Sequence, residues 1–529
     1  MKTVTSAIAA FCLAAFAAQG VSASPAGPIK VSGGMVQGEM DGDLAVFKGI
    51  PFAAPPVGDL RFKPPAPVQK WSAVKETKAF GHACMQNSEA NPRLGLPALD
   101  VSEDCLYLNI WTPAKSAGEK LPVMVWIYGG GFTMGTTSYD LYNGANLARK
   151  GVIVVSIAYR VGPFGFLAHP GLSAESPHHV SGNYGLLDQI AGLKWVKDNI
   201  AAFGGNPDKV TIFGESAGGY SVSMLAASPL AKGLFQGVIS ESGGSFGPNG
   251  SARVPGVSVL TLPAAEKAGE AFAEKLGAMT VADLRKMPAE EMQKKGGGAI
   301  GSSWPVLDDY VIRDDQYKLY QRGHYNDVPV LIGTNSDEGA LFVFNTTADA
   351  FKKSVEADYG PYAQSILKAY PATDDSVALQ SSRDLTRDTL FGWPTWVWAQ
   401  LQADTGKSKV FMYYFNHKPP EAPNAPFKSK GASHGSEMAY VFNNFTPGVN
   451  YTASDHATAE AMATYWTNFA KTGDPNGMGV PEWPRFTNAE PRVMHFNDKP
   501  EAGPVANIPQ LQAVDAYMKW RRSQEVWVP

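Results

Sequence analysis

The sequence has few cysteines, no run of basic residues and no apolar segment long enough to cross a bilayer. Its 529 residues include three cysteines and carry a formal net charge of −4. A chain with this charge and no basic cluster is a poor candidate for binding nucleic acid. No Cys/His cluster has the spacing of metal ligands, and the adjacent His178 and His179 would point apart on regular structure. We therefore expect no nucleic-acid partner, no metal and no cofactor.

The first apolar stretch of the chain is short and lies at the N-terminus. Lys2 precedes twelve mostly small apolar residues at 7–18, and small residues follow at 21–23. Twelve residues are too few to span a bilayer, and the pattern is typical of a secretory signal. We predict a signal peptide at residues 1–23 and a secreted or periplasmic protein without stable membrane insertion. Residues 24–529 are expected to form one domain, because no linker, repeat or low-complexity tract marks a boundary.

Only Cys84 and Cys105 remain after the predicted signal peptide. Export to an oxidising compartment favours a disulfide between them. Closing a loop of this size contributes roughly 3 kcal/mol in the chain-entropy model. Such a bond would stabilise one local loop and contribute little to the fold of a chain of 529 residues.

Apolar, β-branched runs alternate with helical patterns along the chain. The runs lie at residues 122–128, 152–158, 210–213, 237–240, 328–332 and 409–415, and the clearest amphipathic helix at 184–203. This alternation predicts an α/β fold with a largely parallel central sheet flanked by helices. Helical patterns at 263–295 and 348–402 indicate insertions, near 245–325 and 340–405, that form the walls of a substrate pocket.

The pattern Gly-x-Ser-x-Gly occurs three times, around Ser216, Ser245 and Ser433. In α/β-hydrolases this pattern places a nucleophilic serine on a sharp turn between a strand and a helix. Only Ser216 has an apolar, β-branched run before it and a proline-free apolar stretch after it. The flanks therefore predict that Ser216 is the nucleophile.

A nucleophilic serine needs a base within hydrogen-bonding reach and a third group that orients the base. In α/β-hydrolases the chain order is serine, acid, histidine. Asp337 and Glu338 both follow the strand predicted at 328–332, and spacing does not choose between them. For the base, position favours His434, in a loop of small residues, over His417, which closely follows another predicted strand.

Acyl transfer also requires N–H donors for the negative charge that develops on the carbonyl oxygen. Gly129, Gly130 and Gly131 directly follow a predicted strand. Glycine lets the backbone approach a ligand closely and adopt a positive φ. Together with the N–H of Ala217, this loop is predicted to form an oxyanion hole.

Several long segments resemble the type B carboxylesterase family, the α/β-hydrolases that also include the cholinesterases. These segments are residues 47–51, 55–58, 60–62, 102–109, 159–167, 182–189 and 203–207. The resemblance covers nearly all of the chain after the signal peptide. It implies an α/β-hydrolase fold in which Ser216 is the nucleophile, Glu338 the acid and His434 the base.

The resemblance implies further site residues and one departure. It implies the oxyanion donors Gly130, Gly131 and Ala217, the supporting residues Glu215, Ser242 and Glu437, the disulfide Cys84–Cys105, and the ion pairs Arg61–Glu103 and Arg160–Asp188. Cholinesterases that the chain resembles have a tryptophan between the two cysteines, which binds a quaternary ammonium group through cation–π attraction. Residues 85–104 contain no aromatic residue. Choline esters are therefore poor candidate substrates.

The expected activity is hydrolysis of a small-molecule carboxylic ester through an acyl-enzyme intermediate. One alternative is a lipase that acts on long-chain esters. Another is a non-catalytic binding protein on the same fold, which loss of a triad residue would indicate. Ser216, Glu338 and His434 are all present.

Overall fold

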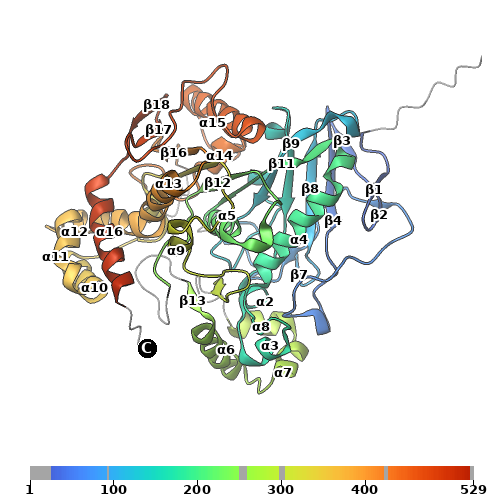
Figure 1. Ribbon diagram of the computed structural model, residues 1–529, viewed down its shortest axis with the longest axis horizontal. Helices are drawn as coiled ribbons and strands as arrows, with labels where there is room; N and C mark the ends of the chain where they lie inside the picture. The colour runs from blue at the N-terminus through green and yellow to red at the C-terminus, as the bar shows by residue number, and fades with distance from the viewer. Residues whose placement is uncertain (1–24, 92–94, 250–258, 297–303, 422–426, 525–529) are drawn as a thin grey trace, which may run out of the picture.

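The computed structural model of the chain describes residues 25–91, 95–249, 259–296, 304–421 and 427–524. The predicted signal peptide, residues 1–23, lies outside these ranges. At the centre is an eleven-stranded sheet with the strand order β18-β17-β16-β15-β12-β11-β9-β10-β8-β4-β3 (Figure 1).

The middle of this sheet is parallel and its edges are antiparallel. The parallel strands are β9 (Leu121–Ile127), β10 (Ile153–Ile157), β11 (Gly205–Glu215), β12 (Gly237–Glu241), β15 (Val330–Asn335), β16 (Val410–Phe415) and β17 (Arg492–Phe496). Antiparallel strands β3 (Glu39–Asp41), β4 (Leu44–Pro51) and β8 (Tyr107–Thr112) form one edge, and β18 (Pro500–Pro504) forms the other. All six predicted strands lie in the parallel part, which confirms the α/β prediction. Their sequences are continuous apolar runs because both faces of a parallel sheet are covered.

Helices α4 (Tyr184–Asn199) and α5 (Ala217–Ala227) pack against β11. The helix predicted at 184–203 is present as α4 followed by a 3₁₀ turn, Ile200–Phe203. One face of this helix is exposed at Lys194 and Asp198, as expected of an amphipathic helix, although its polar residues Asp188 and Gln189 are buried. Helix α5 and the short helix α2 (Gly162–Phe166) both contact α4.

Two groups of helices lie at the periphery of the sheet (Figure 1). One group contains α6 (Leu262–Leu276), α7 (Val281–Lys286) and α8 (Ala289–Gly296). The other contains α10 (Ala348–Tyr359), α11 (Ala363–Ala369), α12 (Asp375–Arg387) and α16 (Ile508–Ser523). Helix α13 (Trp393–Thr405) joins the second group to the sheet through contacts with β15 and β16. The helical patterns at 263–295 and 348–402 thus form helices outside the sheet.

The remaining elements are short, apart from α15. They are β1 (Ile29–Val31), β2 (Gly34–Gln37), β5 (Lys75–Glu76), β6 (Ala83–Cys84), β7 (Val101–Ser102), α1 (Ala145–Ala148), α3 (Pro170–Glu175), β13 (Leu260–Thr261), β14 (Val306–Leu307), α9 (Gln316–Gln321), α14 (Met438–Val441) and α15 (Ala453–Thr472). Within the part of the chain that the structure describes, no helix is both long and apolar enough to cross a membrane.

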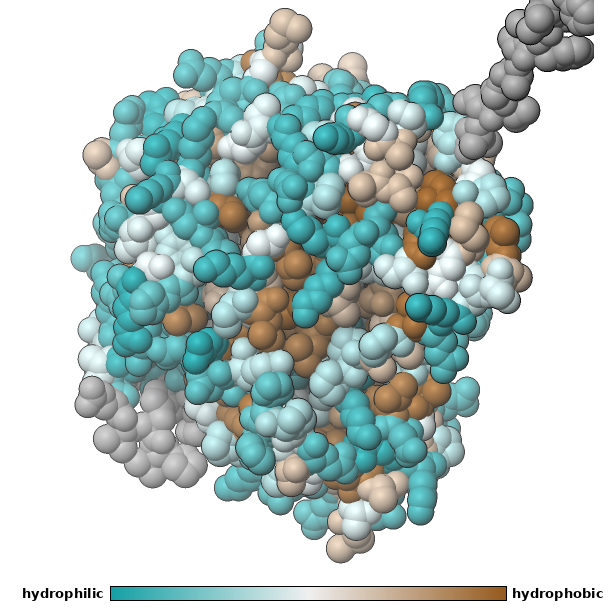
Figure 2. All heavy atoms as spheres, turned by 45° about the vertical axis from the view of Figure 1, so that its right-hand side comes forward, coloured by the Kyte–Doolittle hydropathy of each residue, from teal (hydrophilic) through white to brown (hydrophobic). Residues whose placement is uncertain are grey.

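The surface is mainly hydrophilic on the face shown in Figure 2, where hydrophobic side chains gather in one area near the middle. The exposed large hydrophobic residues of the described ranges are Met40, Val57, Val74, Met279 and Met478. These residues are far apart in the sequence, whereas most large apolar side chains of the described ranges belong to the core.

Candidate active site

Ser216 lies on a sharp turn between β11 and α5. Its backbone has φ 55° and ψ −121°, a conformation that a non-glycine residue rarely adopts. The Ser216 N–H donates to the carbonyl oxygen of Glu241, at 2.9 Å, which anchors the turn to β12. A Cβ atom at Gly214 or Gly218 would lie 2.6 or 1.9 Å from the carbonyl oxygen of Ile127. The two flanking glycines are therefore required for the turn to approach β9.

The other two Gly-x-Ser-x-Gly patterns lack this geometry. Ser245 is buried in an irregular segment after β12, where its N–H donates to Ser223 Oγ. Ser433 lies in the loop before His434, and its carbonyl oxygen accepts from Asn335 Nδ2 at 2.9 Å. Of the three serines, Ser216 alone lies directly between a strand and a helix.

Glu338 begins a 3₁₀ turn after β15, and its carboxylate contacts His434. Its Oε2 lies 2.6 Å from His434 Nδ1. Its Oε1 accepts from Ser242 Oγ at 2.6 Å and from the Asn335 N–H at 2.7 Å. The carboxylate is fully buried, so these three contacts determine its orientation.

Asp337, which spacing left as an alternative acid, has different partners. Its Oδ2 accepts from Ser429 Oγ at 2.6 Å and from the Lys430 N–H at 2.7 Å. The structure therefore brings Glu338, rather than Asp337, onto His434.

His434 lies in the loop between β16 and α14, and its ring is held between aromatic side chains. The ring centroids of Phe391 and Phe342 are 4.5 and 5.1 Å away. Nε2 lies 3.2 Å from Glu215 Oε1, yet makes no hydrogen bond within the described residues. His434 and Ser216 line the same cavity.

His417, the alternative base, lies elsewhere. Its Nε2 is 2.8 Å from Asp455 Oδ1, and the pair is buried. Asp455 also forms the capping box of α15 with Thr452. His417 therefore links the segment after β16 to the N-terminus of α15, and it does not line the cavity that contains Ser216.

The predicted oxyanion loop follows β9 and packs directly against the Ser216 turn. Gly130 and Gly131 have φ values of 111° and 60°. A Cβ atom at Gly129 would lie 2.7 Å from the carbonyl oxygen of Glu215 and 3.0 Å from Ser216 Cβ. Among the described residues, neither the Gly130 nor the Gly131 N–H donates to a protein acceptor. Both glycines line the cavity, together with Ala217.

The cavity at Ser216 has a volume of about 1600 Å³, which is large enough for a bulky ester. Aromatic side chains form much of its wall: Tyr139, Tyr142, Tyr220, Trp304, Phe342, Phe391, Phe427, Tyr440, Phe445 and Tyr451. The disulfide loop contributes aliphatic and polar residues between Gly95 and Asp100. Because residues 85–104 contain no aromatic residue, the wall of the cavity that this loop forms has no aromatic side chain.

Three buried glutamates, Glu215, Glu241 and Glu437, lie around the candidate triad, whose acid Glu338 is also buried. Burial, with the charges of Glu338 and Glu241, raises the pKa of Glu215 well above its usual range. Burial and the charges of Glu215, Glu338 and Glu241 do the same to the pKa of Glu437, which accepts from Asn335 Nδ2. Burial raises the pKa of Glu241 to about 7, although Trp466 Nε1 donates to its Oε1 at 2.8 Å. Burial and the neighbouring negative charges thus both favour the protonated form of the Glu215 and Glu437 carboxyls.

No group of three or more His, Cys, Asp or Glu residues in the described ranges is arranged to hold a metal ion. His178 and His179 are both exposed.

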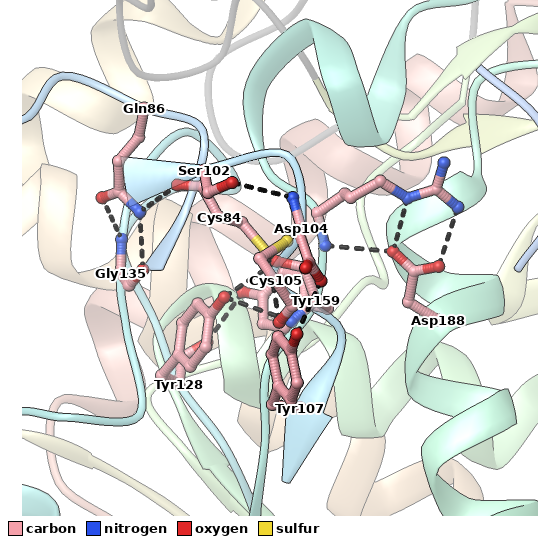
Figure 3. Close-up of a disulfide and its surroundings, with 11 residues drawn as sticks. Cys84, Gln86, Ser102, Asp104, Cys105, Tyr107, Tyr128, Gly135, Tyr159 and Asp188 are labelled. Carbon is pink, nitrogen blue, oxygen red and sulfur yellow. Dashed lines mark hydrogen bonds and ion pairs between the residues drawn. A yellow bond between two sulfur atoms is a disulfide. The ribbon is translucent and has the colours of Figure 1, made fainter. Parts of the chain in front are cut away.

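The predicted disulfide between Cys84 and Cys105 is present (Figure 3). Both implied ion pairs also form. Arg61 Nε lies 2.6 Å from Glu103 Oε1, and Arg160 Nε lies 2.8 Å from Asp188 Oδ2.

Sequence reasoning missed two residues, Asn335 and Gln86. Asn335 contacts the acid through its N–H and the His434 loop through its side chain, which donates to the Ser433 carbonyl oxygen. Its position three residues before Glu338 was the only available signal. Gln86 contacts the segment after the oxyanion loop, 49 residues away in the chain, and its position two residues after Cys84 was the only available signal.

Comparison with known proteins identifies the family. A sequence model described as the carboxylesterase family matches residues 26–516. Fumonisin B1 esterase of Sphingopyxis macrogoltabida is 37% identical over 491 residues, which cover 89% of this chain and 86% of that protein. Para-nitrobenzyl esterase of Bacillus subtilis (strain 168) is 38% identical over 475 residues, with 86% and 91% covered.

A solved structure of a PNB esterase has a TM-score of 0.78 at 34% identity, and the match covers 92% of this chain and 99% of that one. A thermophilic PNB esterase has a TM-score of 0.80 at 33% identity, with the same shares covered. The large sheet flanked by helices is accordingly an α/β-hydrolase fold. The chain therefore belongs to the carboxylesterase family and is a carboxylic ester hydrolase.

Proposed function

We propose that the protein hydrolyses small-molecule carboxylic esters with Ser216 as the nucleophile, His434 as the base and Glu338 as the residue that orients the base. One observation carries this proposal. His434 contacts Glu338 through Nδ1 at 2.6 Å, while the same histidine lines the cavity that contains the strained Ser216 turn. This arrangement matches the roles that acyl transfer requires of a nucleophile, a base and an orienting acid.

In the first step, His434 is the tautomer that carries its proton on Nδ1. This proton is donated to Glu338, because the carboxylate also accepts from Ser242 and Asn335 and has no proton to donate. Nε2 then accepts the proton of Ser216 Oγ while Oγ attacks the ester carbonyl carbon. The N–H groups of Gly130, Gly131 and Ala217 donate to the resulting oxyanion, and Glu338 stabilises the imidazolium.

In the following steps, the tetrahedral intermediate collapses and the alkoxide leaves with the proton from His434 Nε2. The acyl group remains on Ser216 as an ester. Water then attacks this ester and gives a proton to His434, and collapse of the second intermediate returns that proton to Ser216 Oγ and releases the carboxylic acid. This scheme uses no metal or cofactor.

The shape and lining of the cavity support esters with bulky, apolar groups. Its wall includes Trp304, Phe342 and Phe391, which favour an apolar ligand. The relatives are named for fumonisin B1, cocaine and para-nitrobenzyl esters. We propose esters of this bulk for the present chain, rather than choline esters. The Cys84–Cys105 disulfide also supports export to an oxidising compartment.

Replacement of the nucleophile tests the mechanism. Ser216→Ala should lower kcat for p-nitrophenyl butyrate by at least about 10⁴-fold while the protein stays folded. Ser245→Ala, at the centre of another Gly-x-Ser-x-Gly pattern, is the matched control and should retain wild-type turnover. A fluorophosphonate should label Ser216 in the wild-type protein, as mass spectrometry of the labelled peptide would show. Wild-type turnover by folded Ser216→Ala would contradict the proposal.

The ester class is tested separately. Rates on soluble short-chain p-nitrophenyl esters should exceed rates on emulsified long-chain triglycerides. A marked increase in rate at the interface of an emulsion would instead indicate a lipase.

A further inference from the structure

Gln86 binds both backbone groups of Gly135 (Figure 3). Its Oε1 accepts from the Gly135 N–H at 2.8 Å, and its Nε2 donates to the Gly135 carbonyl oxygen at 2.7 Å. Nε2 also donates to the carbonyl oxygen of Cys84 at 2.9 Å. The Gln86 side chain is buried, so its amide makes these hydrogen bonds to protein groups where water cannot replace them.

Residues 129–135 form a turn that begins with the oxyanion glycines and ends at Gly135. The carbonyl oxygen of Gly130 accepts from the N–H groups of Thr133 and Met134, each at 3.1 Å. A Cβ atom at Gly130 would lie 2.3 Å from the Met134 carbonyl oxygen, and one at Gly135 would lie 2.6 Å from the Gly129 carbonyl oxygen. The two ends of the turn are thus packed against each other, and a shift at Gly135 displaces Gly129 and Gly130.

The turn has few other anchors. The Gly162 N–H donates to the Phe132 carbonyl oxygen at 2.7 Å, which is a backbone contact in the middle of the turn. Among the described residues, Gln86 is the one side chain outside the turn that hydrogen-bonds to its backbone. Gln86 therefore anchors the Gly135 end of the turn. Among the described residues, this end has no backbone hydrogen bond to a residue outside the turn.

The disulfide holds Gln86 in turn. Cys84 lies two residues before Gln86 and is bonded to Cys105, which lies two residues before β8 of the central sheet. Cys84 also pairs with Ser102 between β6 and β7. A continuous series of covalent and hydrogen bonds thus connects the sheet to Gly135 through Cys84 and Gln86.

We propose that Gln86 is a positioning residue for the oxyanion hole. It acts through Gly135 to hold the turn of residues 129–135, so that the N–H groups of Gly130 and Gly131 meet the carbonyl oxygen of the substrate. This inference rests on the proposed function. Because a displacement of about 1 Å at a reacting centre costs on the order of 100-fold in rate, loss of the Gln86 bonds should act on the chemical step.

Two substitutions separate the bonds of Gln86. Gln86→Leu removes the donor and the acceptor at similar volume, whereas Gln86→Glu keeps an acceptor for the Gly135 N–H and loses the donor to its carbonyl oxygen. We expect kcat for p-nitrophenyl butyrate to fall about 10- to 100-fold in Gln86→Leu and less in Gln86→Glu, with KM within about threefold of wild type. The matched control is Gln402→Leu. Gln402 is also buried, accepts from Trp398 and donates to the Val328 carbonyl oxygen, yet lies outside the cavity wall.

The inhibition constant of an oxyanion-forming inhibitor distinguishes a positioning role of Gln86 from a merely structural one. A phenethyl trifluoromethyl ketone forms a tetrahedral adduct with a serine nucleophile and presents an oxyanion to the N–H donors. Across wild type, Gln86→Glu and Gln86→Leu, its inhibition constant should rise by the same factor by which kcat/KM falls. Gln402→Leu should lower the melting temperature without changing this inhibition constant. If Gln86→Leu fails to fold, the comparison of Gln86→Glu with wild type carries the test.

The result that would overturn this inference is wild-type kcat and inhibition constant in folded Gln86 variants. A fall in kcat with an unchanged inhibition constant, or an equal fall in Gln402→Leu, would also overturn it. These outcomes differ from failure of the proposed function, in which the wild-type protein is inactive or Ser216→Ala retains turnover.

Discussion

Glu338 Oε2 lies 2.6 Å from His434 Nδ1, although 96 residues separate the two side chains in the sequence. Glu338 follows β15 and His434 follows the neighbouring strand β16, so the contact forms where two parallel strands end at the same edge of the sheet. Ser242, which follows β12 on the other side of β15, donates to the same carboxylate. The acid and the base are thus placed by adjacent strands.

The neighbouring carboxylates Glu338 and Asp337 allow a matched test of the acid. Glu338→Gln should lower kcat by on the order of 10³- to 10⁴-fold, because an amide neither stabilises the imidazolium nor holds the correct tautomer. Asp337→Asn should keep kcat within about threefold of wild type, since Asp337 contacts Ser429 and Lys430 rather than the histidine. Steady-state kinetics on p-nitrophenyl butyrate would measure both. A greater loss in Asp337→Asn would refute the assignment.

Replacement of His434 should affect activity, whereas replacement of His417 should affect stability. His434→Ala should abolish turnover, because it removes the base that accepts the Ser216 proton. His417→Ala should retain kcat but lower the free energy of unfolding by about 1–3 kcal/mol, since it removes a buried partner of Asp455. Thermal denaturation and kinetics on the same samples would check this. Loss of activity in His417→Ala alone would exclude His434 as the base.

Glu241 should make the stability of the protein depend on pH. Burial raises its pKa from the ordinary value of 4.5 to about 7, so the folded state holds the proton more tightly than the unfolded state. Stability contributed by the protonated carboxyl is fully present below 4.5 and is lost as the pH rises through about 7. Glu241→Gln should therefore stabilise the protein above pH 7, by on the order of 2–4 kcal/mol, and have little effect at pH 4.5.

Melting temperatures of wild type and Glu241→Gln between pH 4.5 and 8.5 would measure this difference. Because the charge of Glu241 also helps to raise the pKa values of Glu215 and Glu437, the measured difference includes the response of these two carboxyls to its removal. A constant difference across this range would show that Glu241 does not titrate there.

Gly130 should tolerate no side chain. Gly130→Ala would place Cβ 2.3 Å from the Met134 carbonyl oxygen at a φ of 111°, so the oxyanion turn must move. We expect kcat to fall about 100-fold or more. Gly58→Ala is the control, because Gly58 also has a positive φ, 57°, but a Cβ atom there meets nothing within 4 Å. It should cost about 1 kcal/mol of backbone strain and leave kcat unchanged. Equal kcat losses in the two variants would argue against a specific role of the turn.

Much of the fold could be predicted because its signals are local. Parallel strands buried on both faces are continuous apolar runs, as β10 is, and the flanks of Ser216 distinguished its turn from those at Ser245 and Ser433. The burial of Gln189 in α4 could not be predicted from the helical pattern, because it depends on a contact with Ser221 of α5.

The sequence by itself determined the order of strands and helices, the serine turn and, through family resemblance, the choice of Glu338 and His434. Only the tertiary structure decided which groups surround them. Asp337 and Glu338 are adjacent in the chain, yet one faces Ser429 and the other His434. Gln86 and Gly135 meet across 49 residues because a disulfide and a tight turn bring them together. Contacts of this kind depend on the relative placement of whole elements, and no local pattern of residues encodes that placement.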